Sequence, residues 1–139
     1  LTDVLETLKK EGAKFLPGKV DVWMDCGKKD PTVDTNKKIL GFEEAKGNNL
    51  VADSAVLENS EIIPPCYIGK NVVLKNSTIG PYVSIGENSL VEDSEIRNSL
   101  IQTNVHISNA SLDNAMIGNH ATYNGNFTSV SIGDYTELT

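Results

Sequence analysis

Few residues of this sequence have the type and the spacing that chemistry requires. Asp25 is the most conspicuous, because it ends the strand-like run Val20 to Met24 shortly before a predicted helix start. His106 and His120 are the only histidines, and histidine is the side chain best suited to proton transfer at neutral pH. The elements around Asp25 and the two histidines therefore decide what each of these groups can do.

Composition restricts the function further. Cys26 and Cys66 lie forty positions apart without a CxxC pair or a matching histidine pair, so their spacing indicates neither a zinc site nor a disulfide framework. No run of about 18 apolar residues occurs, which argues against a membrane span, and we expect a cytoplasmic protein. Residues 1–50 are electrically neutral, whereas residues 51–139 hold three basic and ten acidic side chains. A nucleic-acid partner is therefore not expected, because such binding needs basic groups that release counterions.

The first 48 residues predict a short α/β segment. Val4, Leu5 and Leu8 share one face of a predicted helix over residues 2–15. The alternation of apolar side chains over residues 20–24 predicts a strand. Asp30 followed by Pro31 is typical of a helix start, with Asp30 as the N-cap, and we expect a second helix over residues 31–45.

From about Leu50 onwards the sequence is repetitive. The stretches LENSEI (57–62), LKNSTI (74–79) and VEDSEI (91–96) recur at intervals of 17 residues, and ISNASL (107–112) is a weaker copy. Their alignment gives three columns of aliphatic residues: Leu57, Leu74, Val91, Ile107; Ile62, Ile79, Ile96, Leu112; and Ile68, Ile85, Ile101, Ile117. Steps of five or six residues within a turn fit neither a helix nor a hairpin strand.

These steps fit a triangular coil whose flat sides each send one side chain into a central stack. Successive coils would then lie about 4.8 Å apart, as neighbouring strands do. We expect the glycines that follow the aliphatic residues, and the asparagines near the corners, to provide positive φ angles at the bends. The repeated Asn-Ser pairs are predicted to be corner and ladder residues. The sequence therefore predicts a mainly β protein, a parallel β-helix of hexapeptide repeats.

Residues 57–138 resemble the left-handed β-helix of hexapeptide-repeat acyltransferases and sugar nucleotidyltransferases. The left hand is implied by this resemblance alone, because general crossover rules favour the right hand. We accordingly expect residues 49–139 to form a left-handed parallel β-helix domain. The fold by itself says little about function.

The segment Trp23-Met24-Asp25-Cys26-Gly27 resembles the end of the catalytic domain of sugar-1-phosphate nucleotidylyltransferases of the glucose-1-phosphate thymidylyltransferase type. Thr35-Asn36 and Ile39-Leu40 match the following helix of that family, and Cys26 stands where threonine is common. The resemblance implies that residues 1–48 are the end of a catalytic domain plus a connecting helix. It also implies that Asp25 is one of two carboxylates that hold Mg²⁺ against the phosphates of a nucleoside triphosphate and a sugar 1-phosphate.

The Gly-rich loop and the lysine that bind these substrates in that family have no counterpart in residues 1–19. We therefore interpret the chain as the C-terminal part of a longer nucleotidyltransferase, inactive in isolation. The nucleotide and the sugar stay undetermined, because their contacts belong to the missing part.

Two alternatives remain open. His120-Ala-Thr-Tyr123-Asn-Gly125 resembles the His-x-x-Tyr-x-Gly segment of bifunctional N-acetylglucosamine-1-phosphate uridylyltransferases. That resemblance implies acetyl transfer from acetyl-CoA with His120 as the general base, although a corner role is the competing interpretation of this histidine. The third interpretation makes the β-helix a structural module that joins catalytic domains into a homo-oligomer.

Overall fold

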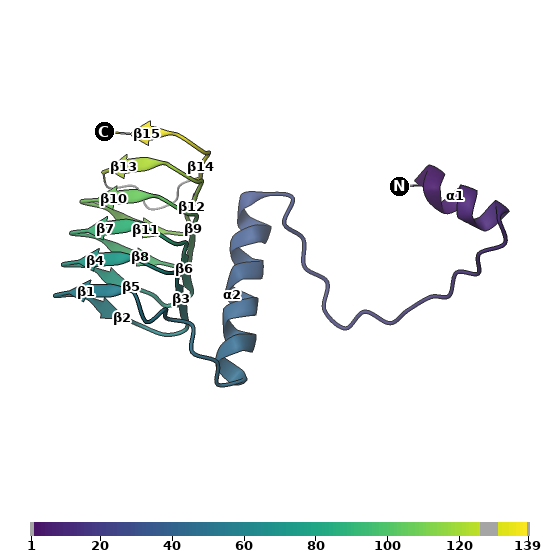
Figure 1. Ribbon diagram of the computed structural model, residues 1–139, viewed down its shortest axis with the longest axis horizontal. Coiled ribbons are helices and arrows are strands. Elements are labelled where there is room, and N and C mark those ends of the chain that lie inside the picture. Colours follow the sequence, from purple (N-terminus) through teal and green to yellow (C-terminus); the bar gives the residue numbers. More distant parts are fainter. Residues whose placement is uncertain (1, 126–130, 139) are drawn as a thin grey trace.

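The computed structural model describes residues 2–125 and 131–138, and it shows a parallel β-solenoid preceded by two helices (Figure 1). The helices are α1 (Thr2–Lys10) and α2 (Lys29–Ala45). Neither is long and apolar enough to cross a membrane, within the residues described. The strands are β1 (Val56–Glu58), β2 (Glu61–Ile62), β3 (Cys66–Ile68), β4 (Val73–Lys75), β5 (Thr78–Ile79), β6 (Val83–Ile85), β7 (Leu90–Glu92), β8 (Glu95–Arg97), β9 (Ser99–Ile101), β10 (His106–Ser108), β11 (Ser111–Asp113), β12 (Met116–Ile117), β13 (Thr122–Asn124), β14 (Ser131–Ile132) and β15 (Glu137–Leu138).

Each coil of the solenoid contributes strands to three parallel sheets. Among the described residues, sheet A contains β3, β6, β9, β12 and β14, sheet B contains β1, β4, β7, β10, β13 and β15, and sheet C contains β2, β5, β8 and β11. Val56 pairs with Val73 and Val73 with Leu90, which is the predicted 17-residue step, and the next step to His106 takes 16 residues. The predicted parallel β-helix is confirmed, and its left hand stays a prediction.

The core is a stack of aliphatic side chains inside the coils. In the three-residue strands of sheet B the middle residue points inward, as in β4, where Leu74 is fully buried between the half-buried Val73 and Lys75. All three predicted columns are confirmed by the pairing of their members from coil to coil. Leu57 and Ile62 are exceptions in burial, because they belong to the first coil and no described coil covers them from below.

The corners are built from asparagines in the left-handed backbone region, as predicted. Asn59, Asn76 and Asp93 have φ angles of 48°, 47° and 48°. Their side chains form a ladder, in which Asn59 Nδ2 donates to Asn76 Oδ1 and Asn76 Nδ2 donates to Asp93 Oδ1, both at 3.0 Å. Asparagine tolerates this conformation because its short polar side chain can hydrogen-bond locally. The ladder therefore joins coil to coil along one edge.

The serines that follow these corners satisfy backbone groups. Ser94 Oγ donates to the carbonyl of Glu92 at 2.6 Å and accepts the amide of Ala110, one coil further on, at 3.1 Å. Ser77 makes the same pair of contacts to Lys75 and Ser94. Buried backbone amides left without partners are costly. The predicted ladder role of the Asn-Ser pairs is thus confirmed.

The expectation for the glycines is mostly wrong. Gly80 does have a positive φ of 113°, but Gly69, Gly86, Gly118 and Gly133 do not. At Gly86 an added Cβ would lie 2.7 Å from the carbonyl carbon and oxygen of Gln102 in the next coil. Glycine is required at such positions because the coils approach too closely for a side chain.

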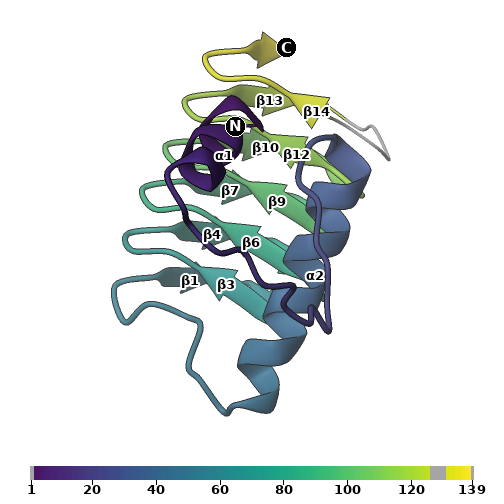
Figure 2. The same ribbon diagram turned by 90° about the vertical axis from the view of Figure 1, so that its right-hand side faces the viewer.

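Helix α2 lies against sheet A, over β6 and β9 (Figure 2). Its buried residues are Val33 and Leu40. Asn36 Oδ1 accepts a 2.6 Å hydrogen bond from Ser84 Oγ of β6. The helix ends where the sequence predicts but begins two residues before Pro31, so Asp30 lies in its first turn and is not the N-cap.

The predicted strand over residues 20–24 is absent, and α1 stops at Lys10, short of the predicted end at residue 15. Residues 13–24 form an extended segment between α1 and the remainder of the chain (Figure 1). Trp23 is 82% exposed and Leu16 90% exposed. An isolated strand has no partner for its backbone groups, so alternation of side chains alone cannot produce it.

The close packing of the coils predicts that alanine substitution lowers stability strongly at one glycine and little at another. We expect Gly86→Ala to destabilise the protein by about 1–3 kcal/mol, because the methyl group meets the backbone of Gln102. Gly133→Ala is the matched control, since an added Cβ there meets nothing within 4 Å. Urea denaturation of both variants measures the difference, and equal midpoints would contradict this account of the glycines.

Candidate functional site

Asp25 lies in the exposed loop that leads into α2. Its Oδ1 accepts a 3.0 Å hydrogen bond from the amide of Gly27, and its backbone carbonyl accepts a 3.4 Å hydrogen bond from Thr35 Oγ1. Thr35 belongs to α2, so the loop is tied to the helix that packs on the solenoid. The segment Trp23 to Gly27 therefore has a defined turn, and the Asp25 carboxylate faces solvent.

The described residues do not make a complete magnesium site around Asp25. No group of three or more histidine, cysteine, aspartate or glutamate side chains is arranged to hold a metal ion in the described part of the chain. Mg²⁺ accepts one or two protein carboxylates when substrate phosphates and water supply the other ligands. Asp25 alone offers one carboxylate, so these residues by themselves do not fit the ion.

His120 occupies a corner of the solenoid. Its φ angle is 57°, and its backbone amide donates to the carbonyl of Thr103 at 3.1 Å. Its ring stacks on the ring of Tyr135, with centroids 4.8 Å apart and planes 7° from parallel. The stack continues the corner column in which Asn104 lies one coil earlier. The catalytic role implied for His120 stays a prediction.

His106 lies on the outer face of sheet B, beside charged residues. Its Nε2 is 3.0 Å from Glu92 Oε2, and Lys75 Nζ is 3.6 Å from Glu92 Oε1. The hydrogen bond from His106 lowers the pKa of the Glu92 carboxyl below its usual value, and the Lys75 charge acts in the same direction. The sequence repeat brings these three side chains together, because they occupy neighbouring strands of one sheet.

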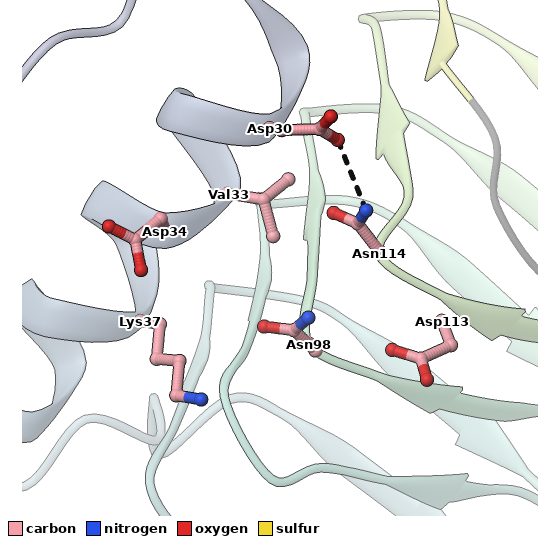
Figure 3. Close-up of a pocket in the computed structure, with 7 residues that line it drawn as sticks. All are labelled: Asp30, Val33, Asp34, Lys37, Asn98, Asp113 and Asn114. Carbon is pink, nitrogen blue, oxygen red and sulfur yellow. Dashed lines mark hydrogen bonds between the residues drawn. The ribbon is translucent and has the colours of Figure 1, made fainter.

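A groove that the sequence did not indicate lies between α2 and one corner of the solenoid (Figure 3). Its volume is about 540 Å³. Asn114 Nδ2 donates to Asp30 Oδ1 at 3.1 Å, and Lys29 Nζ lies 3.0 Å from the same oxygen. Both contacts lower the pKa of the Asp30 carboxyl. The lining residues are Asp30, Val33, Asp34, Lys37, Asn98, Asp113 and Asn114.

The three carboxylates of this groove each have a cationic partner, Asp30 with Lys29, Asp34 with Lys38 and Asp113 with Arg97, so none of them is left to hold a ligand cation. One wall of the groove belongs to α2 and the other to the solenoid, and residues that meet across it, such as Asp30 and Asn114, are far apart in the sequence. No local pattern in α2 indicates which part of the solenoid the helix contacts. Sequence reasoning therefore had no signal for the groove. Carboxylates on an open surface do not by themselves make a binding site.

A smaller cavity of about 290 Å³ lies below the first coil, near the end of α2. Ile62, Pro64, Pro65 and Cys66 contribute to its mostly apolar lining. Burial raises the pKa of the Cys66 thiol, which donates a 3.1 Å hydrogen bond to the carbonyl of Ile63. Because the thiolate is the reactive form, this cysteine is expected to be structural.

No family model and no curated protein matches this chain. The assignment of function therefore depends on the residues and geometry described above.

The contact between His106 and Glu92 predicts a pH dependence of stability. The pKa of Glu92 is lower in the folded protein than in the unfolded chain. Its stabilising effect is therefore present above the unfolded-state pKa of about 4.3 and disappears as the pH falls through the folded-state value. We expect Glu92→Gln to cost about 0.5–1 kcal/mol at pH 7.

Thermal unfolding of the wild type and of Glu92→Gln between pH 7 and pH 3 measures this effect. The two melting curves should converge at the acidic end of that range. A difference that stays constant down to pH 3 would show that packing, and not charge, is responsible. Glu87→Gln provides a control at an exposed carboxylate for which no interaction with His106 is shown.

Proposed function

We propose that this chain is the C-terminal part of a Mg²⁺-dependent sugar-1-phosphate nucleotidyltransferase, in which the solenoid serves in assembly or regulation. The complete enzyme would join a sugar 1-phosphate to a nucleoside triphosphate and release pyrophosphate. We assign this activity to the cytoplasm. The identity of the base and of the sugar is left open.

The observation that carries the proposal is the contrast between the two parts of the chain. Residues 51–125 and 131–138 form a closely packed solenoid, whereas Val20, Val22 and Trp23 are 64%, 50% and 82% exposed. The apolar face of α1 is exposed as well, with Val4 at 58%. Exposed apolar side chains gathered in one segment indicate a missing packing partner. This is the segment whose motif resembles the end of a nucleotidyltransferase catalytic domain.

Asp25 has a defined place in this proposal. Docking of residues 13–24 onto a catalytic domain would bring its solvent-facing carboxylate next to that domain. A second carboxylate from there would complete the donor set that this chain lacks. Bound Mg²⁺ would neutralise phosphate charge during transfer. The contribution of the chain itself is to hold Asp25 through Gly27 and Thr35.

The solenoid supports an assembly role through its rigidity. Backbone hydrogen bonds run from coil to coil, as from the amide of Val73 to the carbonyl of Ser89 at 2.9 Å. Such a stack gives flat faces that hold their shape, which suits contacts between copies. We propose a homo-oligomer on this basis.

The chain alone should bind neither Mg²⁺ nor a nucleoside triphosphate, because Asp25 is its only proposed ligand. Titration calorimetry with MgCl₂, Mg-dTTP and Mg-UTP should give no heat of binding. A micromolar affinity for either nucleotide would contradict the proposal that the substrate site lies outside these residues.

A longer gene product would allow a direct test of Asp25. The intact mass of the protein in its source cells should be well over twice that of this chain. In that protein, Asp25→Asn should lower kcat by at least about 100-fold, because one metal ligand is lost. Asp21→Asn, in the same segment, is the matched control. Full activity of Asp25→Asn would remove its metal role.

A further inference from the structure

The three faces of the solenoid differ in chemistry, and only one of them suits a second copy of the chain. Sheet A is covered by α2 along β6 and β9 (Figure 2). Sheet C presents the exposed carboxylates Glu61 and Glu95 and the pair formed by Arg97 and Asp113, so it lacks an outer apolar column. Sheet B presents an apolar column beside a column of alternating charge.

The register of sheet B defines these two columns. The outer apolar column begins with Val56, Val73 and Leu90 on β1, β4 and β7, and continues with His106 and Thr122. The outer charged column contains Glu58, Lys75 and Glu92, followed by Ser108 and Asn124. The face is open to solvent, since Val56 is 45% exposed and the side chain of Lys75 38% exposed.

The alternation of charge selects one arrangement of two copies. A two-fold axis parallel to the strands and midway between β4 and β7 keeps each column opposite itself but reverses the order of the coils. Lys75 then faces Glu92 of the second copy, and Glu92 faces Lys75. By the same operation Val73 faces Leu90 of the second copy, so the centre of the contact is apolar. At its edges Val56 faces His106 and Glu58 faces Ser108.

We propose that sheet B is the face on which two copies of this chain pair, with the two-fold axis between β4 and β7. The contact is isologous, since the same patch is used by both copies. It deepens the assembly role proposed above and rests on that role, but it does not depend on nucleotidyl transfer.

The size of the face limits the affinity of this contact. About this axis only β1, β4, β7 and β10 face strands of the second copy. Three residues along each strand and a spacing of about 4.8 Å then give a flat area of roughly 10 Å by 20 Å. This is smaller than the roughly 800 Å² per partner of a stable interface. Dimers of the chain alone should therefore form only at high concentration, roughly 0.1–1 mM, and weaken with added salt.

Sedimentation equilibrium of the chain and of charge-reversed variants tests the arrangement. Lys75→Glu places carboxylates opposite each other across the axis, and Glu92→Lys places ammonium groups opposite each other. Each single variant should dimerise at least about tenfold more weakly than the wild type. Lys75→Glu/Glu92→Lys should restore dimerisation, because opposite charges face each other again.

Mixing the two single variants is the sharpest version of the test. Lys75→Glu and Glu92→Lys should form a heterodimer with each other while each alone stays monomeric. Arg97→Glu, which breaks the pair with Asp113 on the face of sheet C, should leave dimerisation unchanged. Circular dichroism melting of each variant confirms that it is folded.

Two results would overturn the inference, and only one of them would also contradict the assembly role of the solenoid. An oligomer unaffected by either single reversal would exclude sheet B as the contact and leave the assembly role standing. A monomer at 1 mM in low salt would remove both the contact and the assembly role.

Discussion

The spacing between stacked coils is the constraint on which the structure depends. Each coil must lie at strand distance from the next, so that backbone groups bond from coil to coil, as the amide of Gly69 does to the carbonyl of Ile85. A corner then has to turn within one or two residues, which requires the left-handed conformation seen at Asn59 and Asn76. The same spacing leaves no room for a side chain at Gly86. Corner residues, glycines and the aliphatic core are thus consequences of one distance.

This common origin explains how much of the fold the sequence could predict. The aliphatic columns and the asparagine corners recur with the coil, so residues such as Ile68 and Ile85 fall into register when the repeats are aligned. The reason for the glycines was not predictable in the same way. Gly80 has a positive φ, whereas Gly86 lies too close to the next coil for a side chain. Both requirements select glycine, so the sequence does not distinguish them, and only the packing of the coils does.

Features without a repeat were harder to predict. The alternation of Val20 and Val22 indicates a strand, but a strand also needs a partner, and sequence alone cannot supply that information. The contact between Asn114 and Asp30 joins residues 84 positions apart. This contact exists because α2 packs on sheet A. No local pattern in α2 or in the solenoid repeat indicates which of the three sheets the helix packs on. The candidate site at Asp25 was found by its motif, while its hydrogen bonds to Gly27 and Thr35 were not.

Helix α2 gives the solenoid a physical connection to Asp25. Ser84 of β6 donates to Asn36, and the adjacent Thr35 donates to the carbonyl of Asp25. The contact of Asn36 with Ser84, the contact of Asp30 with Asn114 and the burial of Val33 and Leu40 together set the position of the helix. Any contact that displaces α2 on sheet A therefore also displaces the loop that carries Asp25. Pairing through sheet B leaves this connection untouched, because α2 lies on a different face.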